Sequence, residues 1–123
     1  MTMKIAFALA ATTLLAMASS LPAQTPDGAA LFRMRCGSCH TVEPGGRAVL
    51  GPNLSGVTGR KAAATTFNYS PALKASNVVW TRANLDRYMQ GPMQMIPGTR
   101  MVIAVSDAGQ RAAILNHLAR PAR

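Results

Sequence analysis

The pentapeptide Cys36-Gly37-Ser38-Cys39-His40 constrains this chain more than any other feature. Two thiols at this spacing can each add to one vinyl group of a haem, and the adjacent imidazole is then placed to ligate the iron. A thioredoxin-like dithiol would need a βαβ context, which the sequence lacks. A zinc site would need four ligands, and His117 is the only His or Cys outside this pentapeptide. A plain disulfide would leave His40 unexplained. We therefore expect one haem c, attached covalently through Cys36 and Cys39.

The first 23 residues have the composition of a secretory signal peptide. Lys4 is followed by an uncharged run of mostly apolar residues that ends at Ala18, and this run is shorter than the roughly 20 residues that a spanning helix needs. Cleavage after Ala18 or after Ala23 is plausible, and Ala23 is preferred because a helix then starts soon after the new N-terminus. We expect residues 1–23 to be removed, residues 24–123 to form one domain, and the protein to be periplasmic.

Capping residues and helix stops predict a small all-α domain with long loops. Residues 44–59 contain five Gly and two Pro and are expected to form a loop, and Met93–Met101 is expected to be irregular because it contains Pro97-Gly98. The chain has only six aromatic residues, so a bound haem would supply missing apolar bulk. The expected helices run from Asp27 to Arg35 with an acidic first turn, from Ser70 to Lys74, from Thr81 to Gly91, and from Ser106-Asp107 to a point before Pro121.

The second axial position on the iron decides the chemistry, because a thioether there favours electron transfer. Met34 lies two residues before Cys36 on the same helix and cannot readily reach the opposite haem face. Met89 falls on an apolar helix face and is expected to be a core residue. The residue pattern leaves three candidates open, and these are Met93, Met95 and Met101.

Four segments in this order resemble class I cytochrome c of the mitochondrial and bacterial c2 type. The resemblance covers the chain from Gly28 to Leu118 and implies an all-α cytochrome c fold with helices and long loops wrapped around one haem. It further implies a one-electron carrier between respiratory or photosynthetic redox complexes, which is not an enzyme. The segments are Cys36–Glu43, Gly51-Pro52-Asn53-Leu54-Ser55-Gly56, Gly59-Arg60-Lys61 and Ile96-Pro97-Gly98-Thr99-Arg100-Met101.

The same resemblance implies a role for each matching residue. His40 and Met101 are similar to the two axial ligands, and Pro52 to the residue whose carbonyl accepts the other ring N–H of the histidine. Tyr88 resembles a tyrosine whose hydroxyl approaches the methionine sulfur. The residues that resemble groups serving the haem propionates are Arg60, Tyr69, Trp80 and Thr99.

The charge balance indicates how the carrier meets other proteins. Lys and Arg number 13 against 4 Asp and Glu, for a net charge of +9, which favours redox protein partners with acidic docking faces. The cations are scattered, with one adjacent pair at Arg60-Lys61, so nucleic-acid binding is not expected. Met93 and Gln94 stand where the resembled family commonly has docking lysines. We expect a monomer whose mature chain does not insert stably into a membrane; the alternative is a dedicated haem c subunit of a periplasmic dehydrogenase.

Overall fold

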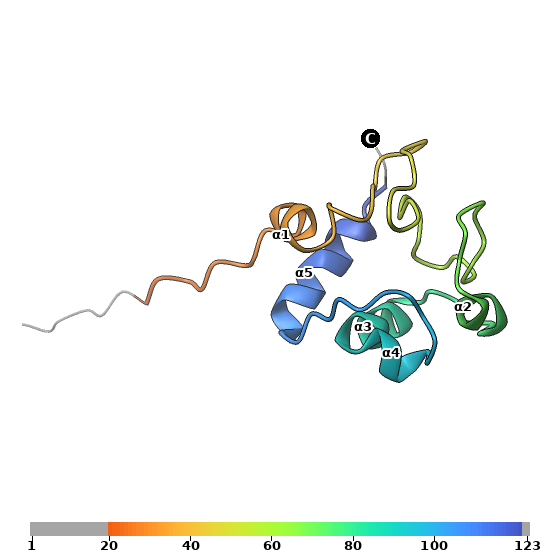
Figure 1. Ribbon diagram of the computed structural model, residues 1–123. Helices are drawn as coiled ribbons and strands as arrows, with labels where there is room; N and C mark the ends of the chain where they lie inside the picture. Colours follow the sequence, from red (N-terminus) through yellow and green to blue (C-terminus); the bar gives the residue numbers. More distant parts are fainter. Residues whose placement is uncertain (1–19, 122–123) are drawn as a thin grey trace, which may run out of the picture.

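Five helices make up the regular structure of the protein in a computed structural model that describes residues 20–121 (Figure 1). Within this range, β structure is limited to one isolated bridge between Lys61 and Val79. The predicted all-α class is therefore confirmed. Most of the predicted signal peptide, residues 1–19, lies outside the described residues. The helices are α1 (Gly28–Arg35), α2 (Pro71–Ala75), α3 (Arg82–Gln90), α4 (Pro92–Met95) and α5 (Ala108–Leu118).

Four of the helices begin at a side chain that caps the first backbone N–H groups. Ser70 accepts from the N–H of Leu73, with Pro71 at the first helical position, and Thr81 caps α3 in the same way. Asp107 caps α5. Asp27 also acts as the cap of α1, so the expectation that it lies in the first turn is wrong. It precedes the helix, and its carboxylate accepts a hydrogen bond from the N–H of Ala29.

The expectation that Met93–Met101 is irregular is wrong for its first part. Gly91 ends α3 as predicted, but Pro92 then starts the short helix α4. Proline lacks a backbone N–H and has a pre-set φ, so it suits the first turn of a helix. The residues after Met95 are non-helical up to α5, as expected.

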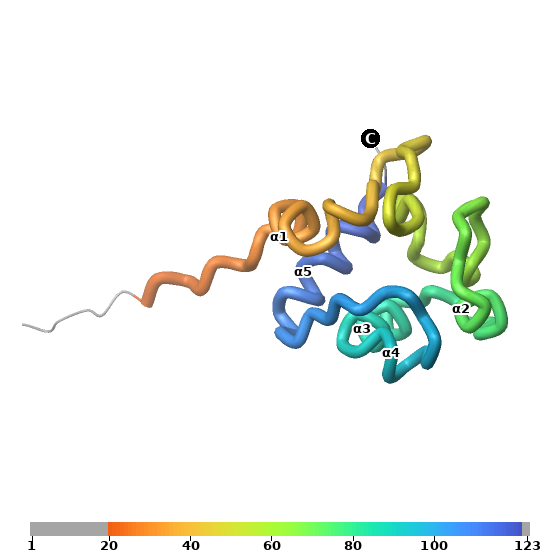
Figure 2. The backbone as a smooth tube through the Cα atoms, viewed as in Figure 1, coloured from red at the N-terminus to blue at the C-terminus, as the bar shows by residue number. Residues whose placement is uncertain are grey.

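The packing of α1 against α5 forms one side of the core. A Cβ at Gly28 would lie 2.1 Å from the carbonyl oxygen of Ala113, so only glycine permits this close approach. The ring of Phe32 lies 5.4 Å from that of His117. Figure 2 shows α1 and α5 on one side of the molecule. The other sides are formed by the loop that follows α1, by helix α2 and by the α3–α4 pair. The buried residues of the core cluster are Phe32, Val57, Ala62, Trp80, Leu85, Tyr88, Met89, Ile96, Val105, Ile114, Leu115 and Leu118.

A buried arginine links α5 to α3. Arg111 is 6% exposed and forms an ion pair with Asp86 at 2.8 Å. The same guanidinium donates to the carbonyls of Val105 and Ser106, just before α5. Among residues 20–121, no helix has the length and apolar character needed to cross a bilayer.

Candidate functional site

The two cysteines and the histidine share one tight turn at the end of α1. The N–H of Cys36 still donates to Phe32, while the N–H groups of Cys39 and His40 both donate to the Cys36 carbonyl. Both cysteines are half-buried with free thiols. Burial raises the pKa of Cys36 to about 11, so before a haem is attached this sulfur is a neutral thiol at neutral pH. The turn thus presents two thiols and an imidazole from five consecutive residues.

The His40 ring is held in one orientation by its neighbours. Its Nδ1 lies 2.8 Å from the carbonyl oxygen of Pro52, and a carbonyl can only accept, so Nδ1 carries the proton and Nε2 keeps its lone pair. Burial lowers the pKa of His40, which favours this neutral form. A Cβ at Gly51 would lie 2.4 Å from His40 Cε1, so the absence of a side chain at Gly51 lets the loop close over the ring.

The loop that carries Pro52 is itself tied down by hydrogen bonds. Asn53 donates through its side-chain amide to the Thr41 hydroxyl and to the Glu43 carbonyl, each at 2.8 Å. Arg60 donates to the carbonyls of Asn53 and Ser55. These bonds fix the Pro52 carbonyl relative to α1, and with it the imidazole. The role of Arg60 toward a propionate stays a prediction.

Three of the other predicted site residues are linked by direct contacts, and the fourth has a different hydrogen-bond partner. The hydroxyl groups of Tyr88 and Thr99 are hydrogen-bonded to each other, and burial raises the pKa of Tyr88. The ring of Trp80 lies 4.9 Å from that of Tyr88. The Tyr69 hydroxyl instead pairs with that of Thr65 at 2.6 Å. The structure therefore joins α3 to the segment before Met101 through Tyr88 and Thr99.

The methionines differ in burial. Met89 belongs to the core. Met34 and Met93 are exposed, by 73% and 54%. Met95 and Met101 are half-buried and pack against the core cluster, and Cys36 packs against the same cluster. Two of the three candidate ligands thus border the apolar centre of the molecule.

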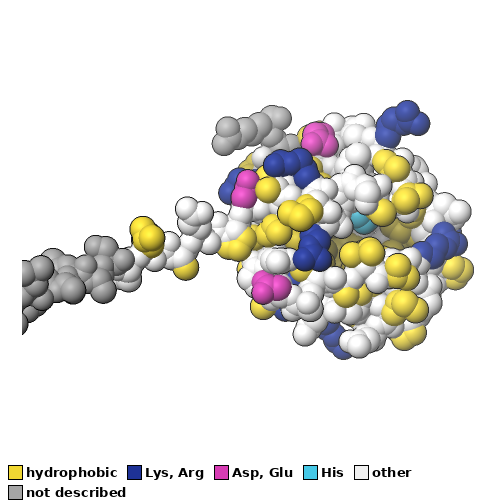
Figure 3. Space-filling model, turned by 60° about the vertical axis from the view of Figure 1, so that its left-hand side comes forward, with side chains coloured by type: hydrophobic (Ala, Val, Ile, Leu, Met, Phe, Trp, Pro, Cys, Tyr) yellow, Lys and Arg dark blue, Asp and Glu magenta, His cyan; other side chains and the backbone are white. Residues whose placement is uncertain are grey.

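These residues fit a covalently attached haem. The chain provides two thiols on one turn, a neutral imidazole with a free Nε2, and apolar neighbours that include Leu54 and Leu73. In Figure 3, hydrophobic side chains gather around a hollow in the surface, and a histidine side chain is visible among them. Within residues 20–121, no group of three His, Cys, Asp or Glu side chains forms an alternative metal site.

The sequence matches the profile of the family described as Cytochrome c over residues 26–120. The chain belongs to the cytochrome c family. It is 48% identical to cytochrome c of Theileria annulata over 92 residues, which cover 74% of this chain and 80% of that protein. It is 36% identical to cytochrome c2 of Rhodomicrobium vannielii over 118 residues, 94% of each chain. The solved structure of cytochrome cH from Methylobacterium extorquens superposes with a TM-score of 0.69 at 32% identity and covers 78% of this chain and 97% of that one.

This membership confirms the predicted resemblance to cytochrome c. It also confirms the predictions that the protein is a mono-haem electron carrier and that its haem c is covalently attached. Cytochromes c transfer electrons and are not enzymes. Gly51 and Asn53 stand in the motif that contains Pro52, but the sequence pattern alone predicts no role for either residue. Their roles depend on contacts with His40 and Thr41 across the loop.

Proposed function

We propose that this cytochrome c is exported and that its haem iron is ligated axially by His40 and Met101. The hydrogen bond from His40 Nδ1 to the Pro52 carbonyl carries this proposal, because it leaves Nε2 unprotonated and aims the ring. When bound, the haem supplies a single site for one-electron transfer at its iron. The chain supplies a rigid imidazole on one side and a thioether on the other.

The position of Met101 supports its choice as the second ligand. Met101 is half-buried against the core, and Thr99, two residues earlier, is anchored to α3 by the Tyr88 hydroxyl. Met93 is 54% exposed. Met95 is half-buried but lies on α4, where its backbone N–H is committed to the Gly91 carbonyl. A thioether at the iron stabilises the reduced state and blocks access of small ligands.

The optical spectrum of the oxidised holoprotein tests the ligation. Met101→Ala should remove the weak band of the methionine–iron bond, lower the potential and open the iron to added imidazole, because the thioether would be gone. Met95→Ala, at the other half-buried candidate, and Met93→Ala are the matched controls and should leave the band in place. Loss of the band in Met95→Ala but not in Met101→Ala would refute the assignment.

Export is the second part of the proposal. Lys4 and the uncharged run that ends at Ala18 support a signal peptide. The match to cytochrome c2 of Rhodomicrobium vannielii covers 94% of this chain, so it includes part of residues 1–23. Periplasmic holoprotein should begin at Ser19 or Gln24, and intact-mass measurement distinguishes the two sites. Holoprotein that retains Met1 in the periplasm would contradict cleavage.

The net charge of +9, which becomes +8 when Lys4 is removed with the signal peptide, supports association with acidic redox proteins. Long-range steering should fade as the Debye length falls from about 30 Å at 0.01 M salt to about 8 Å at physiological salt. Charge reversal at Arg35 or Arg100 should slow electron transfer to an acidic partner more than reversal at Arg120. Stopped-flow rates over a salt series measure this, and equal slowing at all three positions would mean that net charge alone steers the protein.

A further inference from the structure

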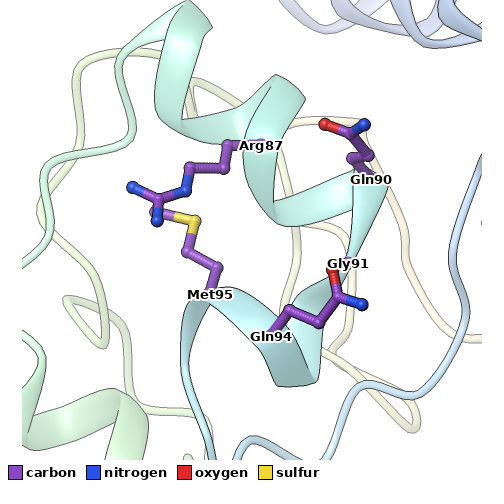
Figure 4. A pocket seen from close by; sticks show the side chains of 5 residues that line it. All are labelled: Arg87, Gln90, Gly91, Gln94 and Met95. Atoms are coloured by element: carbon purple, nitrogen blue, oxygen red, sulfur yellow. The ribbon is translucent and has the colours of Figure 1, made fainter.

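A surface pocket at the junction of α3 and α4 lies outside the residues assigned to the haem. Its volume is about 210 Å³. In Figure 4 the guanidinium of Arg87 lies beside the Met95 thioether on one side, and the amides of Gln90 and Gln94 lie on the other, with Gly91 between them. The lining thus combines one cation, two primary amides and one apolar side chain.

Arg87 has no carboxylate partner within residues 20–121. The whole chain has four acidic residues, and each is committed elsewhere. Asp27 and Asp107 cap helices, Asp86 pairs with Arg111, and the Glu43 carboxylate accepts from the N–H of Val42. In the same range, the side-chain amides of Gln90 and Gln94 make no hydrogen bond either. The pocket therefore offers a cation and amide donors that the described part of the protein leaves unused.

Gly91 leaves space for the amide of Gln94. A Cβ at position 91 would lie 2.7 Å from Gln94 Oε1 and 3.1 Å from Gln94 Cδ. The φ of Gly91 is −164°, extended backbone that any residue can adopt. Alanine at this position would therefore displace the amide of Gln94 without straining the backbone and without changing the net charge.

We propose that this pocket receives one carboxylate side chain from an acidic redox partner. The inference rests on the proposed function of the protein as a carrier that meets such partners. Arg87 can donate two parallel N–H bonds to a carboxylate, and an amide N–H from Gln90 or Gln94 can add a third. The Met95 side chain provides apolar contact for the methylene groups of a glutamate.

The location of the pocket relates it to electron transfer. Met95 is followed directly by the non-helical segment that leads through Thr99 to Met101. Gln94, which stands where the resembled family commonly has a docking lysine, contributes an amide to the pocket. The charge for docking is thus supplied by Arg87, one helix earlier. A partner held here would contact the protein next to the segment that carries the proposed ligand.

Nuclear magnetic resonance of the reduced, ¹⁵N-labelled holoprotein tests the pocket with two matched peptides. Acetyl-Gly-Glu-Gly-amide should shift the amide signals of Gln90, Gly91, Gln94 and Met95, and acetyl-Gly-Gln-Gly-amide should not. Arg87→Gln should weaken binding of the glutamate peptide at least about tenfold. Gly91→Ala should weaken it several-fold at unchanged charge. Arg120→Gln, which also removes one exposed cation, should change it by less than about twofold.

Two results would overturn the proposal. Equal weakening in Arg87→Gln and Arg120→Gln would mean that overall charge, and not the pocket, binds the peptide. Tighter binding of free glutarate than of the glutamate peptide would assign the pocket to a small organic acid and not to a protein side chain. The ligation is judged separately, because the methionine–iron band, recorded after oxidation of the same samples, reports on Met101 whatever the peptides do.

Discussion

Replacement of Gly51 by alanine should disturb the iron-ligating histidine directly. The new Cβ would lie 2.4 Å from His40 Cε1, 2.7 Å from Nδ1 and 2.9 Å from Nε2. Ordinary contact begins at 3.4 Å, so the ring must move by about 1 Å. Such a shift would stretch or break the 2.8 Å hydrogen bond to Pro52. Overpacking and the lost hydrogen bond together should lower the free energy of unfolding by about 2–4 kcal/mol.

Thermal unfolding of the holoprotein and a redox titration measure the effect. For a domain of this size the melting temperature should fall by roughly 10–30 °C, and the potential should change because the imidazole is displaced. Gly56→Ala is the control: its φ of +65° imposes about 1–2 kcal/mol of backbone strain, but its Cβ meets nothing within 4 Å. It should lower the melting temperature and leave the potential unchanged. A Gly51→Ala protein that matches the wild type in both measurements would refute the packing described for His40.

Three further changes test other parts of the structure. Cys36→Ala or Cys39→Ala should leave at most one thioether bond and reduce the yield of haem protein, measured by haem staining of denatured periplasmic extracts; a well-folded, haem-free wild type would contradict this. Arg111→Met should lower the free energy of unfolding by about 3 kcal/mol in denaturant titration, because it leaves a carboxylate and two carbonyls without their donor; a loss below about 1 kcal/mol would contradict the structural role. Thr99→Val should cost about 1–3 kcal/mol by leaving the buried Tyr88 hydroxyl unpaired, and adding Tyr88→Phe should recover part of this loss; no recovery would mean that the hydroxyl pair is not the cause.

Much of the helical architecture could be predicted because helix starts are encoded locally. The side chains of Ser70 and Thr81 each accept a hydrogen bond from the backbone N–H three residues later, so their capping roles can be predicted without tertiary structure. The sequence does not predict the short helix α4, because Gly91-Pro92 indicates the end of the preceding helix and not the start of another. Proline that ends one helix can begin the next, and the choice depends on where the chain turns, which the sequence pattern does not reveal.

The haem-attachment chemistry was predictable for a different reason. Thioether attachment and ligation by the neighbouring imidazole require adjacent residues, so Cys36, Cys39 and His40 form a contiguous motif. Other contacts in the core join residues that are distant in the sequence. The Arg111–Asp86 ion pair and the Tyr88–Thr99 hydrogen bond join residues 25 and 11 positions apart. Such pairs depend on how α3 packs against α5 and against the segment before Met101, and no local pattern specifies them.

The same distinction applies to partner recognition. A count of charges predicts attraction to acidic proteins but does not say which cation makes the contact. The structure narrows this choice by showing which guanidinium donors are already used. Arg111 is buried and paired with Asp86, and Arg60 donates to two backbone carbonyls. With all four carboxylates engaged elsewhere, Arg87 remains beside two free amides in a pocket of its own. We therefore expect docking specificity to depend on a cation that folding places beside unused amide donors, and the comparison of Arg87→Gln with Arg120→Gln separates that cause from net charge.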